Sequence, residues 1–286
     1  MNVQIRDLSF ISISELVQVF NHAFADYAIP ISLTVELMEL KIVQEHIQLN
    51  LSVGIFDEDK IVGFILTGVL WLDGYLNVYN AGTGVIPQYR GQEWTKKMYA
   101  FLDQKLRTVQ VKQHQLEVLT TNKKAIHLYT TLGFKISRTL SCYKGFIARH
   151  EINPKIKIIE EANIEQHVLK SFWTIEPAWQ YSLASLDKTN SSNTILGAYL
   201  DGILLGYAII NFHKSRILQI AVHEKYRRQG IGSALMTNIL NQFNSKEVTM
   251  INVDTSEIGI HAFFEYCGMK IFIEQYEMKR SIQNEI

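Results

Sequence analysis

Residues 227–233 read Arg227-Arg228-Gln229-Gly230-Ile231-Gly232-Ser233, between an apolar stretch typical of a strand and apolar residues at helical spacing. The glycines allow successive backbone N–H groups to point at one place, where a helix that starts at Ile231 would also aim its positive end. The two arginines add charge-assisted hydrogen bonds of the kind that phosphates accept. The stretch predicts an anion site, although a lone Gly-x-Gly indicates little more than a helix start.

The context of this stretch occurs twice in the chain. Residues 51–67 and 194–211 each predict a β-hairpin around a polar turn. After each hairpin come a further strand, a basic loop with glycine, a helix, a short strand, a helix and a last strand. The recurrence indicates a duplication, which we align on three pairs of glycines: Gly63 with Gly206, Gly91 with Gly230, and Gly133 with Gly268. The polar residues 147–155 separate the copies, so we predict domains at 1–147 and 155–286.

The composition narrows the class of protein. Lys plus Arg and Asp plus Glu number 28 each, so no global charge attracts nucleic acid or an anionic membrane. Only two cysteines occur, and the first residues lack a secretion signal, so we expect a cytoplasmic protein without disulfides. The longest apolar stretches are too short or too interrupted to span a bilayer. His127 and His223 lack metal-ligand spacing, so no metal is expected.

The 227–233 stretch resembles the diphosphate loop of the GCN5-related N-acetyltransferase (GNAT) family, which reads Arg or Gln, two residues of any type, Gly, any residue, and Gly or Ala. The resemblance covers nearly the whole chain as two copies. It implies an α/β (α+β) fold of two tandem GNAT-like domains, each a mixed, mostly antiparallel sheet flanked by helices. It also implies that acetyl-CoA is a co-substrate, with its diphosphate on the loop and its pantetheine on the preceding strand. The cofactor-binding residues implied in this copy are Ile220, Val222, Arg227, Arg228, Gln229, Gly230, Ile231, Gly232 and Ser233.

The first copy departs from the family pattern at one position. It reads Gln88-Tyr89-Arg90-Gly91-Gln92-Glu93, with Glu93 where the family has Gly or Ala. A carboxylate about 7 Å from a phosphate charge would oppose binding by roughly 2 kcal/mol. Glu93 could instead point into solvent and favour the start of the helix. The cofactor-binding residues implied in this copy are Val85, Ile86, Gln88, Arg90 and Gly91.

A second motif, residues 122–134, resembles the family's Asn, Ala, Leu-Tyr, Gly-Phe segment. The resemblance implies that Tyr129 protonates the departing CoA thiolate, whereas burial in the core is the alternative. The second copy has Phe264 at this position, which has no proton to give. Asn122 reads better as a helix cap than as a catalytic residue. Glu117, in an apolar strand, is a candidate base for the amine or part of a solvated strand face.

These observations predict an acetyl-CoA-dependent N-acetyltransferase that moves an acetyl group directly to a primary amine. The expected acceptor is a small-molecule or peptide amine, and nothing in the sequence names it or the oligomeric state. The alternative is a non-catalytic acyl-CoA-binding or interaction module with one or both copies degenerate, which Glu93 and Phe264 motivate. A third possibility divides the labour, with the second copy catalysing and the first shaping the acceptor pocket.

Overall fold

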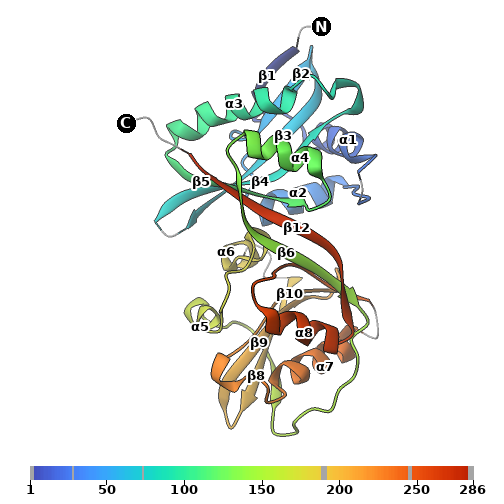
Figure 1. Cartoon of the computed structure of the whole chain (residues 1–286), viewed down its shortest axis with the longest axis vertical. Helices are drawn as coiled ribbons and strands as arrows, with labels where there is room; N and C mark the ends of the chain where they lie inside the picture. Colours follow the sequence, from blue (N-terminus) through green and yellow to red (C-terminus); the bar gives the residue numbers. More distant parts are fainter. Residues whose placement is uncertain (1–2, 28, 73, 188–191, 244–246, 283–286) are drawn as a thin grey trace. The chain divides into compact units, whose positions relative to one another are not determined.

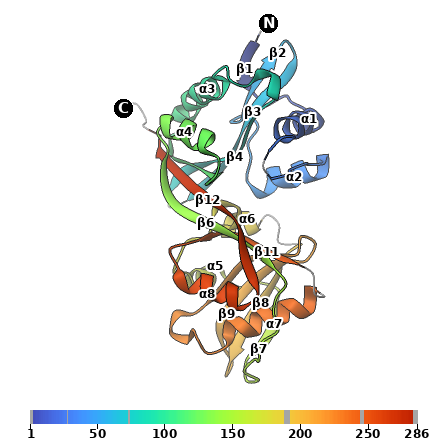
Figure 2. The same cartoon turned by 45° about the vertical axis from the view of Figure 1, so that its right-hand side comes forward.

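The computed structural model describes residues 3–27, 29–72, 74–187, 192–243 and 247–282. The chain forms two compact units: unit 1 contains residues 1–137 and 277–286, and unit 2 contains residues 138–276. Each unit has a mixed sheet in which most strand pairs are antiparallel, with helices packed on it (Figures 1 and 2). The predicted α/β class is confirmed.

The sheet of unit 1 has the strand order β1-β2-β3-β4-β5-β12. Its strands are β1 (Val3–Asp7), β2 (Val53–Asp57), β3 (Lys60–Leu72), β4 (Tyr75–Val85), β5 (Val111–Leu119) and the end of β12 (Met269–Ser281). Two helices lie on each side of this sheet in Figure 2: α1 (Ile13–Phe24) and α2 (Val35–Gln44) on one, α3 (Trp94–Thr108) and α4 (Lys123–Thr131) on the other. The predicted hairpin of residues 51–67 is confirmed as β2 and β3.

Local sequence signals explain where these helices begin. Ser12 and Glu15 form a capping box at the start of α1, in which each side chain accepts from the other residue's backbone N–H. Asn122 caps α4, because its side chain accepts a hydrogen bond from the Ala125 backbone N–H. The cap function predicted for Asn122 is therefore confirmed.

The sheet of unit 2 has the strand order β12-β6-β11-β10-β9-β8-β7, to which β12 contributes residues 269–276. Its strands are β6 (Lys135–Gly145), β7 (Lys157–Glu161), β8 (Thr194–Leu200), β9 (Ile203–Asn211), β10 (Arg216–Val222) and β11 (Val248–Asp254). Its helices are α5 (Gln166–Ser171), α6 (Leu183–Asp187), α7 (Ile231–Phe243) and α8 (Ile258–Tyr266). The hairpin of residues 194–211 is confirmed as β8 and β9. Before this hairpin the described residues form the short helices α5 and α6, with a 3-10 turn at Trp179–Tyr181 between them.

The last strand of each sequence copy takes part in the sheet of the other copy. Residues 277–286, at the end of the second copy, belong to unit 1, where the Ile282 N–H donates to the Lys112 carbonyl at 3.1 Å. Most of β6, at the end of the first copy, belongs to unit 2 and pairs with β11. In Figures 1 and 2, β6 (green) and β12 (red) run side by side. The predicted ranges 1–147 and 155–286 follow the two copies of the sequence. The compact units differ from these ranges at β6 and β12, because most of β6 belongs to unit 2 and the end of β12 belongs to unit 1.

Candidate functional site

A cavity of about 790 Å³ lies in unit 2 where two parallel strands part. The pairing of β10 with β11 is confined to Arg216 and Thr249, and beyond it residues 218–222 and 250–253 line the cavity. A third wall is formed by residues 172–181, which we call the wall segment. The glycine loop (residues 227–233) and one face of α8 complete the lining.

The glycine loop presents the start of a helix to this cavity. The helix α7 begins at Ile231, as predicted, directly after Gly230, whose φ of +84° suits glycine. A Cβ atom at Gly232 would lie 2.9 Å from the ring of Phe263, so glycine permits close packing of α7 on α8. Of the residues that the sequence implied for this copy, all but Gln229 line the cavity: Ile220, Val222, Arg227, Arg228, Gly230, Ile231, Gly232 and Ser233.

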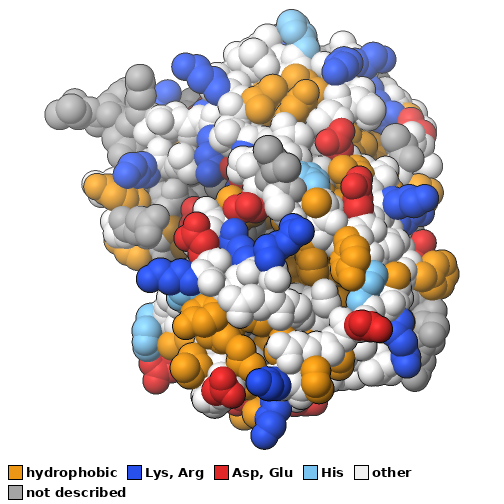
Figure 3. Space-filling model, turned by 60° about the horizontal axis from the view of Figure 1, so that its bottom comes forward, with side chains coloured by type: hydrophobic (Ala, Val, Ile, Leu, Met, Phe, Trp, Pro, Cys, Tyr) orange, Lys and Arg blue, Asp and Glu red, His pale blue; other side chains and the backbone are white. Residues whose placement is uncertain are grey.

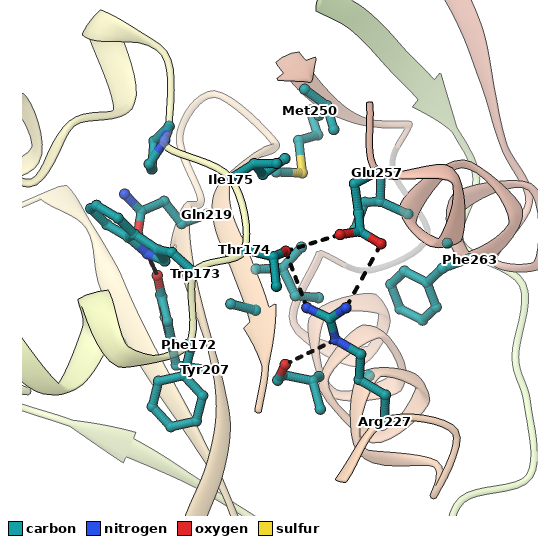
Figure 4. Close-up of a pocket in the computed structure, with 18 of the residues that line it drawn as sticks. Phe172, Trp173, Thr174, Ile175, Tyr207, Gln219, Arg227, Met250, Glu257 and Phe263 are labelled. Atoms are coloured by element: carbon teal, nitrogen blue, oxygen red, sulfur yellow. Dashed lines mark hydrogen bonds and ion pairs between the residues drawn. The ribbon is translucent and has the colours of Figure 1, made fainter. Parts of the chain in front are cut away.

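Arg227 joins the glycine loop to the wall segment and to α8 (Figure 4). Its Nε donates to the Val222 carbonyl at 3.3 Å, and its Nη2 donates to the Thr174 hydroxyl at 3.2 Å. The Thr174 hydroxyl donates in turn to Glu257 Oε2 at 3.0 Å. Arg227 Nη1 lies 3.7 Å from Glu257 Oε1, which makes a long ion pair. Three elements are thus connected by three side chains.

A chain of buried polar groups fixes the wall segment to the sheet. Trp173 Nε1 donates to the Tyr207 hydroxyl at 2.6 Å, and that hydroxyl donates to Gln219 Oε1 at 2.7 Å. The amide nitrogen of Gln219 donates to the Tyr181 carbonyl at 2.6 Å. Burial raises the pKa of the Tyr207 phenol well above its ordinary value, so this hydroxyl keeps its proton. The wall segment is therefore anchored at both of its ends.

The first copy has an equivalent loop, but its residues align with those of the second copy differently from the predicted pairing of Gly91 with Gly230. Arg90 Nε donates to the Val85 carbonyl at 2.9 Å, five residues back, as Arg227 does to Val222. The residue after each arginine also has positive φ, +77° at Gly91 and +64° at Arg228. The alignment of Gly91 with Gly230 is therefore wrong by two residues, because a non-glycine residue takes the left-handed conformation in one copy.

In this register Glu93 replaces Gly230, with φ +58° against +84°. Its side chain is 68% exposed and lies 2.6 Å from Lys96, a contact that lowers the pKa of the Glu93 carboxyl. Arg90 is engaged by both carboxylate oxygens of Asp26, at 2.6 and 2.8 Å, and by the Ala23 carbonyl. Its guanidinium is thus more fully committed than that of Arg227.

The candidate acid and base, Tyr129 and Glu117, belong to unit 1. Tyr129 is 9% exposed, and its hydroxyl bonds with Asn80 and Thr83. Burial raises the pKa of Tyr129 to about 12. Glu117 accepts a hydrogen bond from the Tyr79 hydroxyl. The other residues implied in this copy, Val85, Ile86, Gln88, Arg90 and Gly91, also belong to unit 1, whereas every residue that lines the cavity belongs to unit 2.

The residues of unit 2 that are equivalent to Tyr129 and Glu117 have no titratable side chain. Phe264 stands in the place of Tyr129, four residues before the glycine that follows the helix, and is fully buried. Counted back from the same glycine, Asn252 stands in the place of Glu117. Asn252 has a φ of +59° at a break in the pairing of β11 with β6, and lines the cavity. The cavity and the titratable pair therefore occur in different units.

Sequence reasoning missed the residues that oppose the glycine loop. Four separate parts of the chain supply them, and only the fold brings these parts together: Trp173 and Thr174 of the wall segment, Tyr207 of β9, Gln219 of β10, and Glu257 before α8. No short motif links residues so far apart in the chain. Within the described residues, no group of His, Cys, Asp and Glu side chains is arranged to hold a metal ion. No helix in the described part of the chain is long and apolar enough to cross a membrane.

Comparison with known proteins gives the family. The profile described as "Acetyltransferase (GNAT) family" matches residues 17–134 and residues 158–269. The chain belongs to the GNAT acetyltransferase family. Both copies of this GNAT protein are matched, which confirms the resemblance seen in the sequence. A search of curated protein sequences found no match.

Solved structures show the same tandem fold. A GCN5-related N-acetyltransferase from Sphaerobacter thermophilus has a TM-score of 0.73 at 16% identity, over 99% of this chain and 97% of that one. A tandem GNAT protein from the clavulanic acid biosynthesis pathway has a TM-score of 0.71 at 12% identity, over 100% of both chains. A GCN5-related N-acetyltransferase from Anabaena variabilis has a TM-score of 0.61 at 13% identity, over 99% and 73%. At these identities the likeness establishes the fold.

Proposed function

We propose that unit 2 binds acetyl-CoA and transfers its acetyl group to a primary amine, and that unit 1 has lost the donor site. The observation that carries the proposal is the cavity of about 790 Å³ that opens onto the glycine loop and the start of α7. Membership of the GNAT family supports acyl transfer in general. The amine acceptor, a small molecule or a peptide, and a cytoplasmic location remain part of the proposal.

The residues of unit 2 have distinct parts in this reaction. Backbone N–H groups of the glycine loop and the positive end of α7 bind the diphosphate, supported by the guanidinium groups of Arg227 and Arg228. The open edges of β10 and β11 offer backbone groups to an extended ligand, and the wall segment faces the acceptor. The amine nitrogen attacks the thioester carbonyl carbon and the carbon–sulfur bond breaks. The amine proton goes to water, and the thiolate takes a proton from water.

Tyr129 is excluded from this proposal as an acid. Burial raises the pKa of Tyr129 to about 12, above the ordinary pKa of a thiol, and this disfavours proton transfer to a thiolate. Phe264 and Asn252 leave unit 2 without an acid or base at the positions equivalent to Tyr129 and Glu117. Catalysis in unit 2 then depends on positioning and on stabilisation of the oxyanion by backbone N–H groups. These substitutions also favour the second candidate function, an acyl-CoA-binding module without turnover.

Substitutions at Gly230 test the donor site. Asp at this position would place a carboxylate beside the diphosphate, and at about 7 Å this costs roughly 2 kcal/mol, so CoA affinity should fall about thirtyfold. Gly230→Asn is the matched control, since it has the same shape, tolerates positive φ and adds no charge. Gly91→Asp adds the same carboxylate in unit 1 and should leave affinity unchanged. Calorimetry with CoA measures all three variants, and wild-type affinity in Gly230→Asp would contradict the proposal.

Turnover separates the two candidate functions. The wild-type protein is incubated with acetyl-CoA and a panel of primary amines, and release of the free CoA thiol is followed. Thiol release that depends on an amine supports the transferase. Tight CoA binding without release across the panel supports the binding module instead.

A further inference from the structure

The residues Thr174, Arg227 and Glu257 form a bridge between the wall segment, the glycine loop and α8 (Figure 4). The Thr174 hydroxyl is central, because it accepts from the guanidinium and donates to the carboxylate. The side chains of Arg227 and Glu257 are 34% and 29% exposed, so water reaches this pair. One guanidinium of the glycine loop is thus held by groups that belong to other walls of the cavity.

The equivalent arginine of unit 1, Arg90, has a closer carboxylate partner than Arg227 has. Arg90 makes a bidentate ion pair with Asp26, with both N–O distances below 3 Å. The Arg227–Glu257 distance of 3.7 Å is much longer, and its Thr174 bond is to a neutral hydroxyl. Bidentate pairing is the strong form of the arginine–carboxylate interaction. By contact geometry the bridge of unit 2 is the looser of the two, although the Arg90–Asp26 pair is the more exposed, at 40% and 58%.

We propose that this bridge competes with the diphosphate of the acyl donor for Arg227, so that donor binding releases the Thr174 side chain. The inference rests on the proposed function of unit 2. The wall on either side of Thr174 stays anchored, because Trp173 donates to Tyr207 and the Glu176 carbonyl accepts from Arg138 Nη1 at 2.6 Å. The apparent donor affinity is reduced by the fraction of molecules with the bridge closed. Breaking the bridge by substitution should remove that reduction.

Two substitutions and their combination test the competition. Thr174→Val removes both hydrogen bonds of the bridge without changing any charge, and Glu257→Gln removes the carboxylate. Each variant should bind CoA about three- to tenfold more tightly in calorimetry, as expected for the loss of about one net hydrogen bond. The double variant should bind no more tightly than the tighter single variant, because the three groups act as one unit. Glu265→Gln is the matched control, since it removes an exposed carboxylate from the same helix, and its affinity should equal that of the wild type.

The alternatives give different patterns. Tighter binding in Glu257→Gln together with wild-type binding in Thr174→Val would mean that the carboxylate merely repels phosphates, and would overturn the inference. Weaker binding in Thr174→Val would make its hydroxyl a ligand of CoA and would overturn it as well. In both cases the wild-type protein still binds CoA, so the proposed function of unit 2 survives. No binding of CoA to the wild-type protein would overturn the proposed function and this inference together.

Discussion

Tyr129 belongs to the segment that resembles the family motif, and its side chain is buried. It lies in the core of unit 1, bonded to Asn80 and Thr83 and packed against the rings of Tyr99 and Phe134. We expect Tyr129→Phe to leave turnover of the whole protein unchanged and to lower the free energy of unfolding by about 1 kcal/mol, the net value of a buried hydrogen bond. Tyr75→Phe, at a phenol that is 50% exposed, should change neither quantity. Reduced turnover in a fully folded Tyr129→Phe protein would restore its assignment as an acid.

The same scale shows what the sequence could predict. The Asn122 cap and the start of α7 at Ile231 depend on local geometry, so the pattern of neighbouring residues was sufficient. The register of the first loop was not predictable from its glycine, because positive φ is carried by Glu93 and Arg228 as well as by Gly91. The residues that oppose the glycine loop could not be predicted from the sequence either, because only tertiary contacts bring Thr174 to Glu257.

At the scale of elements, the hairpins followed from alternating patterns and turns, but the last strands did not. Which strand lies beside β5 is decided by long-range pairing, and local patterns do not specify it. The end of β12 is fixed in unit 1 by Arg280, whose side chain is 8% exposed. Its guanidinium donates to the carboxylate of Asp103 and to the Leu132 carbonyl, and lies 4.6 Å from the ring of Phe134. A buried arginine therefore anchors the strand that comes from the other copy.

Removal of this anchor tests the importance of the strand for unit 1. Arg280→Met removes the ion-pair partner of Asp103, whose side chain is only 24% exposed. Because a carboxylate that is largely buried then lacks a partner, we expect the free energy of unfolding to fall by about 3 to 5 kcal/mol. Lys270→Met, at an exposed residue of the same strand, is the control and should cost little. Denaturant unfolding measures both variants. Equal stability of the two would show that the pairing of β12 alone holds the strand.

At the scale of the whole molecule, the balanced charge provides no long-range attraction for a charged ligand. On the face shown in Figure 3, Lys and Arg side chains are dispersed among Asp and Glu, in keeping with the equal totals of 28 each. Binding must then be decided by the individual site, and the two copies differ there. The glycine loop of unit 2 has Gly230 where unit 1 has Glu93, and the arginine of unit 1 is held by Asp26.

This difference predicts that CoA protects one copy of the loop and leaves the other unchanged. In hydrogen exchange followed by mass spectrometry, saturating CoA should slow exchange of the amides of residues 228–233, because these N–H groups would bind the diphosphate. Residues 89–95 should exchange at the same rate with and without CoA, and they serve as the internal control within a single sample. Protection of residues 89–95 would place a donor site in unit 1 despite Glu93. Faster exchange confined to the amides of residues 174 and 175 in the same experiment would follow if donor binding releases the Thr174 side chain.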